Sequence, residues 1–151
     1  MPNKTVIVSL SDEKYFELLL ELIDSINNFN QSKEVDICIL DAGMNDEQIN
    51  TLRQKVKQIK KAEWDIDVPG YKVRNKEWLK SQVSRAFLPN YFPDYENYIW
   101  IDSDAWVNDW HAIDLLIKGC KMKELAITQT IAPGYRDIGK VNWIFGNIAV
   151  S

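Results

Sequence analysis

The chain has 151 residues, of which 46% are hydrophobic and 26% are charged, so its composition is that of an ordinary globular protein. This length fits one domain that buries roughly 68–70% of the surface exposed by the unfolded chain. The 18 basic and 22 acidic residues give a net charge of −4, which argues against nucleic acid or an anionic membrane as the main partner.

The chain opens with a strand pattern followed by a helix pattern. Residues 5–10 form a short β-branched run that predicts a strand. Residues 13–29 then carry apolar side chains at helical spacing, with Ser11 and Asp12 as candidates for the helix N-cap. The apolar face is wide, as expected for a helix packed against a sheet.

The same alternation continues after the first helix. Residues 35–41 predict a second strand, and Asn45 caps a second helix whose buried stripe extends to Ile59. Residues 62–68 alternate polar and apolar side chains, which predicts a third strand with one solvated face. We interpret Asp65-Ile66-Asp67 within it as structural.

Further elements follow toward the carboxyl end. Residues 75–87 predict a helix, another begins at Asn108 or Asp109 and ends at Gly119, and residues 125–128 are a strand candidate. Strands that alternate with helices indicate an α/β fold with a largely parallel sheet.

The sharpest functional signal follows the strand predicted over residues 98–101. Its four bulky residues run without alternation, as in a strand buried on both faces, which places Trp100 in the core. Asp102 and Asp104 leave its end on the same side, about 6.6 Å apart at Cα. With carboxylates roughly 5 Å apart and an effective dielectric of about 20, their repulsion is about 3 kcal/mol. A bound cation, or a proton held on one of them, would relieve it.

Polar side chains also gather at the other strand ends. Ser11 and Asp12 follow the first strand, and Asp41 ends the second. Part of this pattern is expected wherever strands lead into capped helices, yet ligands of open α/β sheets bind at the carboxyl ends of the strands. Hard oxygen ligands suit Mg²⁺ or Mn²⁺, which usually combine one or two carboxylates with substrate phosphates.

Targeting and redox signals are few. No apolar run reaches the 18 residues of a transmembrane helix, and the first residues lead into no signal peptide. Cys38 and Cys120 are too isolated for a disulfide framework or a zinc motif. We expect a protein of the reducing cytoplasm, either free or peripheral to a membrane, without a transmembrane segment.

Three segments in the right order give the chain a resemblance to the family 8 glycosyltransferases. Residues 37–43 resemble the second strand and turn of that family, residues 82–89 its arginine-bearing helix, and residues 98–107 its strand, D-x-D motif and following turn. Family 8 enzymes are retaining transferases of the GT-A fold that use nucleotide sugars, mostly UDP-sugars. The resemblance implies a Rossmann-like α/β/α sandwich that forms a nucleotide-sugar-binding domain over residues 1–151.

The resemblance assigns roles to residues around the D-x-D motif. It implies that Asp102 and Asp104 hold Mn²⁺, or Mg²⁺, against the UDP diphosphate, with Ser103 at the nucleotide sugar. It implies that Arg85 approaches the sugar or phosphate, the alternative being a surface arginine on a helix.

The resemblance also assigns residues to the nucleotide. It implies that Ser11, Asp12, Tyr15 and Asp41 contribute to nucleotide-sugar binding, the last three near uracil or ribose. Tyr15 has the alternative of a core aromatic on the first helix. Asp41 has the alternative of capping the region of the second helix.

Several residues fit the family pattern less well. Trp106 and Trp110 flank the D-x-D turn as sugar-stacking candidates, although core packing is favoured, and His111 is interpreted as a surface or capping residue. Residues 133–137 are a candidate loop over the sugar, and residues 145–149 match the family's Asn-Ala-Gly-like stretch poorly. The later half of the family's domain is missing, so we expect a domain truncated at its C-terminus, with unknown catalytic residues.

The predicted function is glycosyl transfer of the hexosyltransferase type, from a UDP-sugar to a hydroxyl of a glycan, lipid or protein acceptor. One alternative is a truncated nucleotide-binding module without turnover. A second is a nucleotidyltransferase, but residues 9–14 contain no glycine and so lack the Gly-rich phosphate loop of those enzymes.

Overall fold

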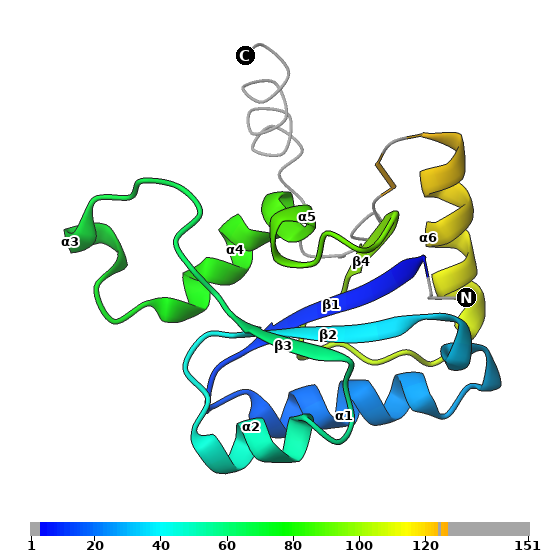
Figure 1. Cartoon of the computed structure of the whole chain (residues 1–151), viewed down its shortest axis with the longest axis horizontal. Coiled ribbons are helices and arrows are strands. Elements are labelled where there is room, and N and C mark those ends of the chain that lie inside the picture. The colour runs from blue at the N-terminus through cyan, green and yellow to red at the C-terminus, as the bar shows by residue number, and fades with distance from the viewer. Residues whose placement is uncertain (1–3, 124, 127–151) are drawn as a thin grey trace, which may run out of the picture.

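The computed structural model describes residues 4–123, 125 and 126. Four strands make one parallel sheet in the order β3-β2-β1-β4 (Figure 1). The strands are β1 (Thr5–Ser11), β2 (Asp36–Asp41), β3 (Gln58–Lys61) and β4 (Asn97–Trp100). The predicted α/β class with a largely parallel sheet is therefore confirmed.

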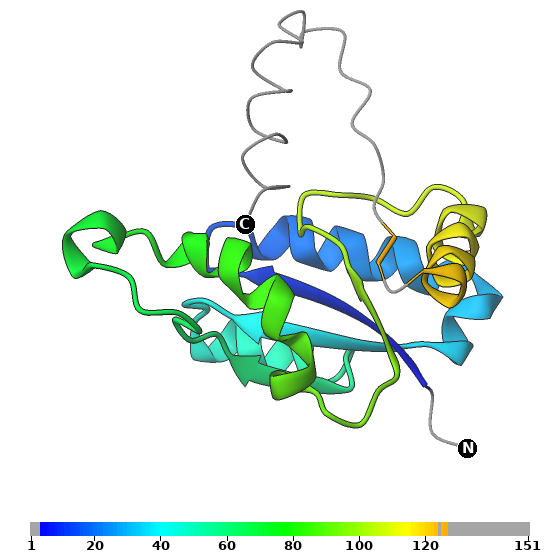
Figure 2. The same cartoon turned by 90° about the horizontal axis from the view of Figure 1, so that it is seen from above.

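Helices lie on both faces of this sheet (Figure 2). The α-helices are α1 (Phe16–Asn27), α2 (Asp46–Leu52), α3 (Gly70–Val73), α4 (Lys80–Ser84), α5 (Leu88–Tyr91) and α6 (Trp110–Met122). Three 3-10 helices join them: η1 (Asn30–Glu34), η2 (Glu77–Leu79) and η3 (Arg85–Phe87). None of the described helices combines the length and apolar character needed to cross a membrane.

The alternation of side chains along β1 divides the core into two layers. Ile7 packs with α1, β2 and α6 on one face, where Leu19 and Ile113 are buried. Val6 and Val8 pack on the other face with α5 and its flanks, including Phe92. Since both faces of β1 are covered, all seven of its residues are buried, as in the central strand of a parallel sheet.

Cys38 of β2 lies in the second layer and is fully buried. Its Sγ is 3.8 Å from the hydroxyl of Tyr95, which donates a hydrogen bond of 2.8 Å to Asp36. Burial raises the pKa of the Cys38 thiol to about 11 and also raises the pKa of Tyr95. Both groups are therefore protonated parts of the core at neutral pH.

The predictions for residues 45–68 were right at the start and wrong at the end. Asn45 caps α2 as expected, in a capping box with Gln48. The helix ends at Leu52, however, and Ile59 belongs to β3, where it pairs with Ile39 of β2. The apolar spacing suited a longer helix, but from residue 57 onward the backbone forms hydrogen bonds with β2 instead. The strand predicted over 62–68 is absent.

Residues 77–87 are helical as predicted, although the helix is divided into η2, α4 and η3. The strand predicted to be buried on both faces is β4, in which Ile99 alone is buried. The reason is topological, because β4 pairs only with β1 among the described residues. Trp100 is consequently half-buried rather than a core residue.

The last described helix begins as predicted and ends later. Asp109 caps α6 by accepting a hydrogen bond of 2.9 Å from the backbone N–H of His111. Gly119 does not end the helix, which continues to Met122. A Cβ at Gly119 would lie 2.7 Å from Cβ of Ala126, so glycine here permits a close approach. Residues 125 and 126 are not in a strand, and the predictions for 127–151 lie outside the described residues.

Candidate functional site

A hollow of about 500 Å³ opens where β1 and β4 end, beside η2, α4 and η3. Its lining residues are Leu10, Ser11, Asp12, Lys14, Tyr15, Trp78, Ser81, Gln82, Arg85, Trp100, Asp102, Ser103 and Asp104. Seven of the eight predicted site residues are among them, and only Asp41 is not. The carboxyl ends of parallel strands thus bring together groups that are distant in sequence, at the usual place for a ligand in such sheets.

Asp102 is held by two donors that meet at one of its oxygens. The indole Nε1–H of Trp100 donates to Oδ1 at 2.8 Å, and Nη2 of Arg85 donates to the same atom at 2.7 Å. The Arg85 guanidinium also lies over the Trp100 ring, with Cζ 5.1 Å from the ring centroid. Its Nε donates to the backbone carbonyl of Ser81 at 3.0 Å, so Arg85 is fixed from three sides.

Asp104 differs from Asp102 in having no hydrogen bond or ion pair to any described residue. It is exposed and lines the same hollow. Within the described part of the chain, Oδ2 of Asp102 also has no donor, because both contacts fall on Oδ1. The pair therefore offers carboxylate oxygens to a cation, and Arg85 offsets only part of the repulsion between them.

The two carboxylates fit a hard divalent cation only in combination with a ligand. No group of three or more His, Cys, Asp or Glu side chains suited to a metal occurs among residues 4–123, 125 and 126. Two carboxylates that require phosphate oxygens to complete the shell are typical of magnesium-type sites. The donor set is thus consistent with a metal that arrives with a phosphate.

The turn after β1 is built by Asp12. Its Oδ1 accepts hydrogen bonds from the backbone N–H groups of Lys14 at 3.0 Å and Tyr15 at 3.1 Å. Ser11 Oγ donates to the Asp12 carbonyl at 2.9 Å. Neither residue caps α1, which begins at Phe16. Tyr15 is 45% exposed and lines the hollow, so the alternative of a core aromatic is wrong.

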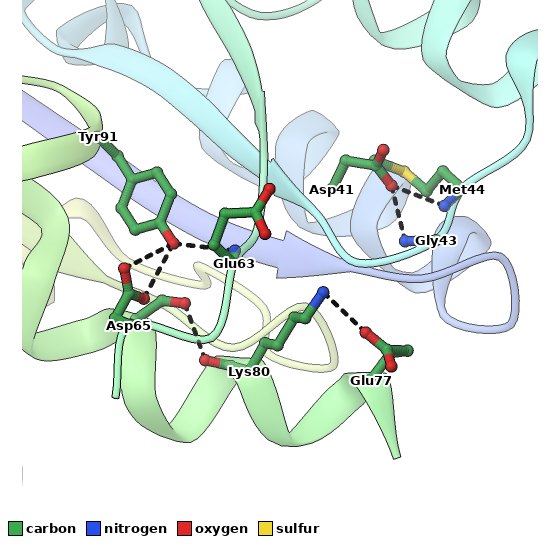
Figure 3. Close-up of polar contacts among 9 residues, drawn as sticks. Asp41, Gly43, Met44, Glu63, Asp65, Glu77, Lys80 and Tyr91 are labelled. Atoms are coloured by element: carbon green, nitrogen blue, oxygen red, sulfur yellow. Dashed lines mark hydrogen bonds and ion pairs between the residues drawn. The ribbon is translucent and has the colours of Figure 1, made fainter. Parts of the chain in front are cut away.

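Asp41 lies away from the hollow. Its Oδ1 accepts hydrogen bonds from the backbone N–H groups of Gly43 at 2.8 Å and Met44 at 2.7 Å (Figure 3). Gly43 has φ of 125°, a conformation that favours glycine. Asp41 instead lines a smaller hollow beside β3, together with Lys57 and Lys61. In this structure it fixes the turn before α2, as its alternative interpretation proposed.

Core packing, which the sequence favoured for Trp106 and Trp110, is confirmed for Trp110 and wrong for Trp106. Trp110 is 5% exposed and belongs to the core, whereas Trp106 is 58% exposed and does not line the hollow. The lining instead contains Trp78 and Trp100, which sequence reasoning missed. Trp78 precedes Arg85 by seven residues, a spacing that places two residues on the same face of a helix. This spacing was the sequence signal that could have placed Trp78 in the site.

The second Asp-x-Asp pair is structural, as predicted, but it is not in a strand. The buried hydroxyl of Tyr91 donates to both oxygens of Asp65 at 2.9 Å and accepts from the backbone N–H of Glu63 at 3.0 Å (Figure 3). Lys80 is 7% exposed and forms an ion pair of 2.7 Å with Glu77. The Tyr91 contacts fix residues 63–65, and the ion pair joins η2 to the start of α4.

Solved structures with a similar fold include two of the glycosyltransferase LgtC. One is an active-site mutant, Q189E, with 18% sequence identity and a TM-score of 0.52. The other is galactosyltransferase LgtC in complex with donor and acceptor sugar analogs, with 17% identity and a TM-score of 0.53. Each comparison covers 72% of this chain and 41% of the LgtC chain, so this chain spans less than half the length of those structures.

Sequence comparison complements this likeness. A search of curated proteins finds no match to the chain. The family model described as glycosyl transferase family 8 matches residues 6–116, which contain β1 to β4 and every residue that lines the hollow. The fold and this match agree with the resemblance carried by the D-x-D motif, and the chain belongs to glycosyl transferase family 8.

Proposed function

We propose that the hollow binds the donor of a glycosyl transfer reaction, a UDP-sugar, together with Mn²⁺ or Mg²⁺. The observation that carries this proposal is the convergence of Asp102, Asp104 and Arg85 at the carboxyl ends of β1 and β4. Two available carboxylates and one guanidinium suit a metal-bound diphosphate. The similar fold of LgtC, which has been solved in complex with donor and acceptor sugar analogs, supports a role in binding a donor sugar.

Different lining residues would contact different parts of the donor. Asp102 and Asp104 would hold the metal, and Arg85 would contact the phosphate or sugar. Asp12 and the exposed ring of Tyr15 lie on the β1 side of the hollow, where they would face the nucleoside. A tyrosine ring is well suited to pack on a flat base while its hydroxyl hydrogen-bonds to water or ligand.

In the proposed reaction, the bond between the sugar's anomeric carbon and the diphosphate oxygen breaks, and UDP leaves with the bonding electrons. The anomeric carbon forms a new bond to the hydroxyl oxygen of a glycan, lipid or protein acceptor, and the proton of that hydroxyl passes to the departing diphosphate or to solvent. A bound metal supplies neutralisation of the charge that develops on the diphosphate. Arg85 adds a second positive charge on that group and orients it.

Titration calorimetry of the chain with UDP, with and without Mn²⁺, tests the proposed donor site. We expect metal-dependent binding that Asp102→Asn or Asp104→Asn abolishes. Asp67→Asn is the matched control, since Asp67 belongs to the structural Asp-x-Asp and is exposed. Unchanged UDP affinity in both site variants would refute the assignment.

A second measurement tests turnover. The chain is incubated with Mn²⁺ and a panel of UDP-sugars, and released UDP is quantified with and without sugar acceptors. Release that depends on Asp104 supports glycosyl transfer or donor hydrolysis by this chain. Tight, metal-dependent binding without release from any donor would instead identify a donor-binding module that does not turn over.

A further inference from the structure

Trp100 makes specific polar contacts at the end of β4. Its Nε1–H donates to Oδ1 of Asp102 at 2.8 Å, two residues along the same chain. Its ring lies under the Arg85 guanidinium, which donates to the same oxygen at 2.7 Å. The three side chains therefore form a closed triangle, in which Trp100 contacts both of the others directly.

Trp100 combines core packing with this polar contact. Part of its side chain packs against the core layer that contains Val8 and Phe92, and it also lines the hollow. The N–H of a tryptophan usually finds a hydrogen-bond partner. Here the partner is an exposed carboxylate proposed as a metal ligand, so the geometry serves the orientation of Asp102.

We propose that Trp100 is a positioning residue for the metal and the donor. Its N–H holds Asp102 with Oδ1 occupied, which leaves Oδ2 to face the metal, and its ring keeps the Arg85 guanidinium beside the diphosphate position. This inference rests on the proposed function, because it assigns Trp100 a role toward the metal proposed there. Hydrogen-bond partners of ligating carboxylates typically change metal affinity about 10–100-fold when they are removed.

The two donors at Oδ1 have separable effects. Arg85 brings a positive charge that competes with a metal, whereas the indole brings only a dipole and carries no net charge. Loss of the indole N–H therefore leaves Asp102 held by Arg85 alone, without removing any repulsion of the metal. The expected effect of losing it is weaker metal binding.

The test compares Trp100→Phe with wild type by calorimetric titration of Mn²⁺ in the presence of UDP. Phenylalanine keeps an aromatic face under Arg85 and removes the N–H. We expect about 10-fold weaker Mn²⁺ affinity, and a thermal midpoint lowered by the packing that the smaller ring loses against the core. Trp106→Phe is the matched control, since Trp106 is 58% exposed and does not line the hollow, and we expect no change there.

A second readout does not alter Trp100 at all. The Nε1–H resonance of Trp100, identified by its loss in Trp100→Phe, is followed by ¹⁵N NMR in the metal-free wild type and in Asp102→Asn. We expect an upfield shift of the proton in Asp102→Asn, because the charged acceptor is lost. If Trp100→Phe does not fold, the resonance is identified instead by elimination, from the spectra of Trp→Phe variants at the other five tryptophans of the sequence.

The outcomes separate this inference from the proposed function. Wild-type chain that binds no Mn²⁺ with UDP would overturn both. Wild-type binding with equal Mn²⁺ affinity in Trp100→Phe would overturn only the role of Trp100, as would an Nε1–H resonance that is the same in Asp102→Asn. A shifted resonance with weakened Mn²⁺ binding supports it.

Discussion

The hydroxyl of Tyr91 secures residues 62–79 to α5, and Tyr91→Phe removes that group alone. Burial raises the pKa of Tyr91, so at neutral pH the hydroxyl is protonated and donates to the Asp65 carboxylate. A hydrogen bond to a charged group contributes about 1.5–3 kcal/mol. Asp65 is half-buried, and the Glu63 N–H that also loses its partner is near solvent. We therefore expect the lower part of that range, about 1.5–2 kcal/mol.

Equilibrium unfolding in urea measures this loss. With an m-value of about 2 kcal/mol/M, the midpoint of Tyr91→Phe should fall by about 1 M while the m-value stays constant. Tyr15→Phe is the matched control, because Tyr15 is 45% exposed, and its midpoint should change by less than about 0.3 M. Equal midpoints for Tyr91→Phe and wild type would refute the reasoning that this hydroxyl anchors the segment.

Three further predictions concern other parts of the chain. Asn45→Ala removes the cap that accepts from Gln48 N–H at 3.0 Å and should cost about 1 kcal/mol in urea unfolding. Asp104→Asn should change the free energy of unfolding by less than about 0.5 kcal/mol, because this exposed side chain contacts no described partner. The pKa of Cys38 is raised from 9.0 to about 11, so the unfolded thiol ionises first and stability should fall as pH rises from 9 to 11, with a smaller slope in Cys38→Ala. A steeper slope in Cys38→Ala would contradict the assignment.

The elements that sequence predicted well are those in which local and tertiary preferences agree. β1 and β2 are β-branched runs, and α1 has a wide apolar face that packs on them. Asn45 and Asp109 cap α2 and α6 through their own side chains. Each of these features depends on residues within a few positions of one another, so the sequence contains the whole signal.

The errors arise where a partner distant in sequence decides the outcome. Ile59 continues a helical spacing, but β2 offers its backbone a ladder. The apolar run of β4 suited a strand buried on both faces, yet β4 has a single neighbour in the described sheet, so Trp100 turns a face to the hollow.

The candidate site was predictable as a cluster because the sheet topology converts strand ends into one edge. Seven predicted residues meet there without any of them being close in sequence to all the others. What sequence could not supply was the set of contacts within the cluster. The pairing of Arg85 with Asp102, and the N–H of Trp100 on the same oxygen, require the packing of α4 and η3 beside β4.

The charges in the hollow are expected to couple the binding of the metal to the binding of the nucleotide. Among the described residues, it is lined by the three carboxylates of Asp12, Asp102 and Asp104 and by two cations, Lys14 and Arg85. A diphosphate alone would therefore meet a site with excess negative charge, and one of the two cations is already paired with Asp102. A bound divalent cation would change the net charge of the hollow from negative to positive. It would also compete with Arg85 for the carboxylate of Asp102, which frees the guanidinium for the phosphate. In the proposed site, metal and nucleotide should thus each strengthen binding of the other, as thermodynamic linkage requires of any such coupling.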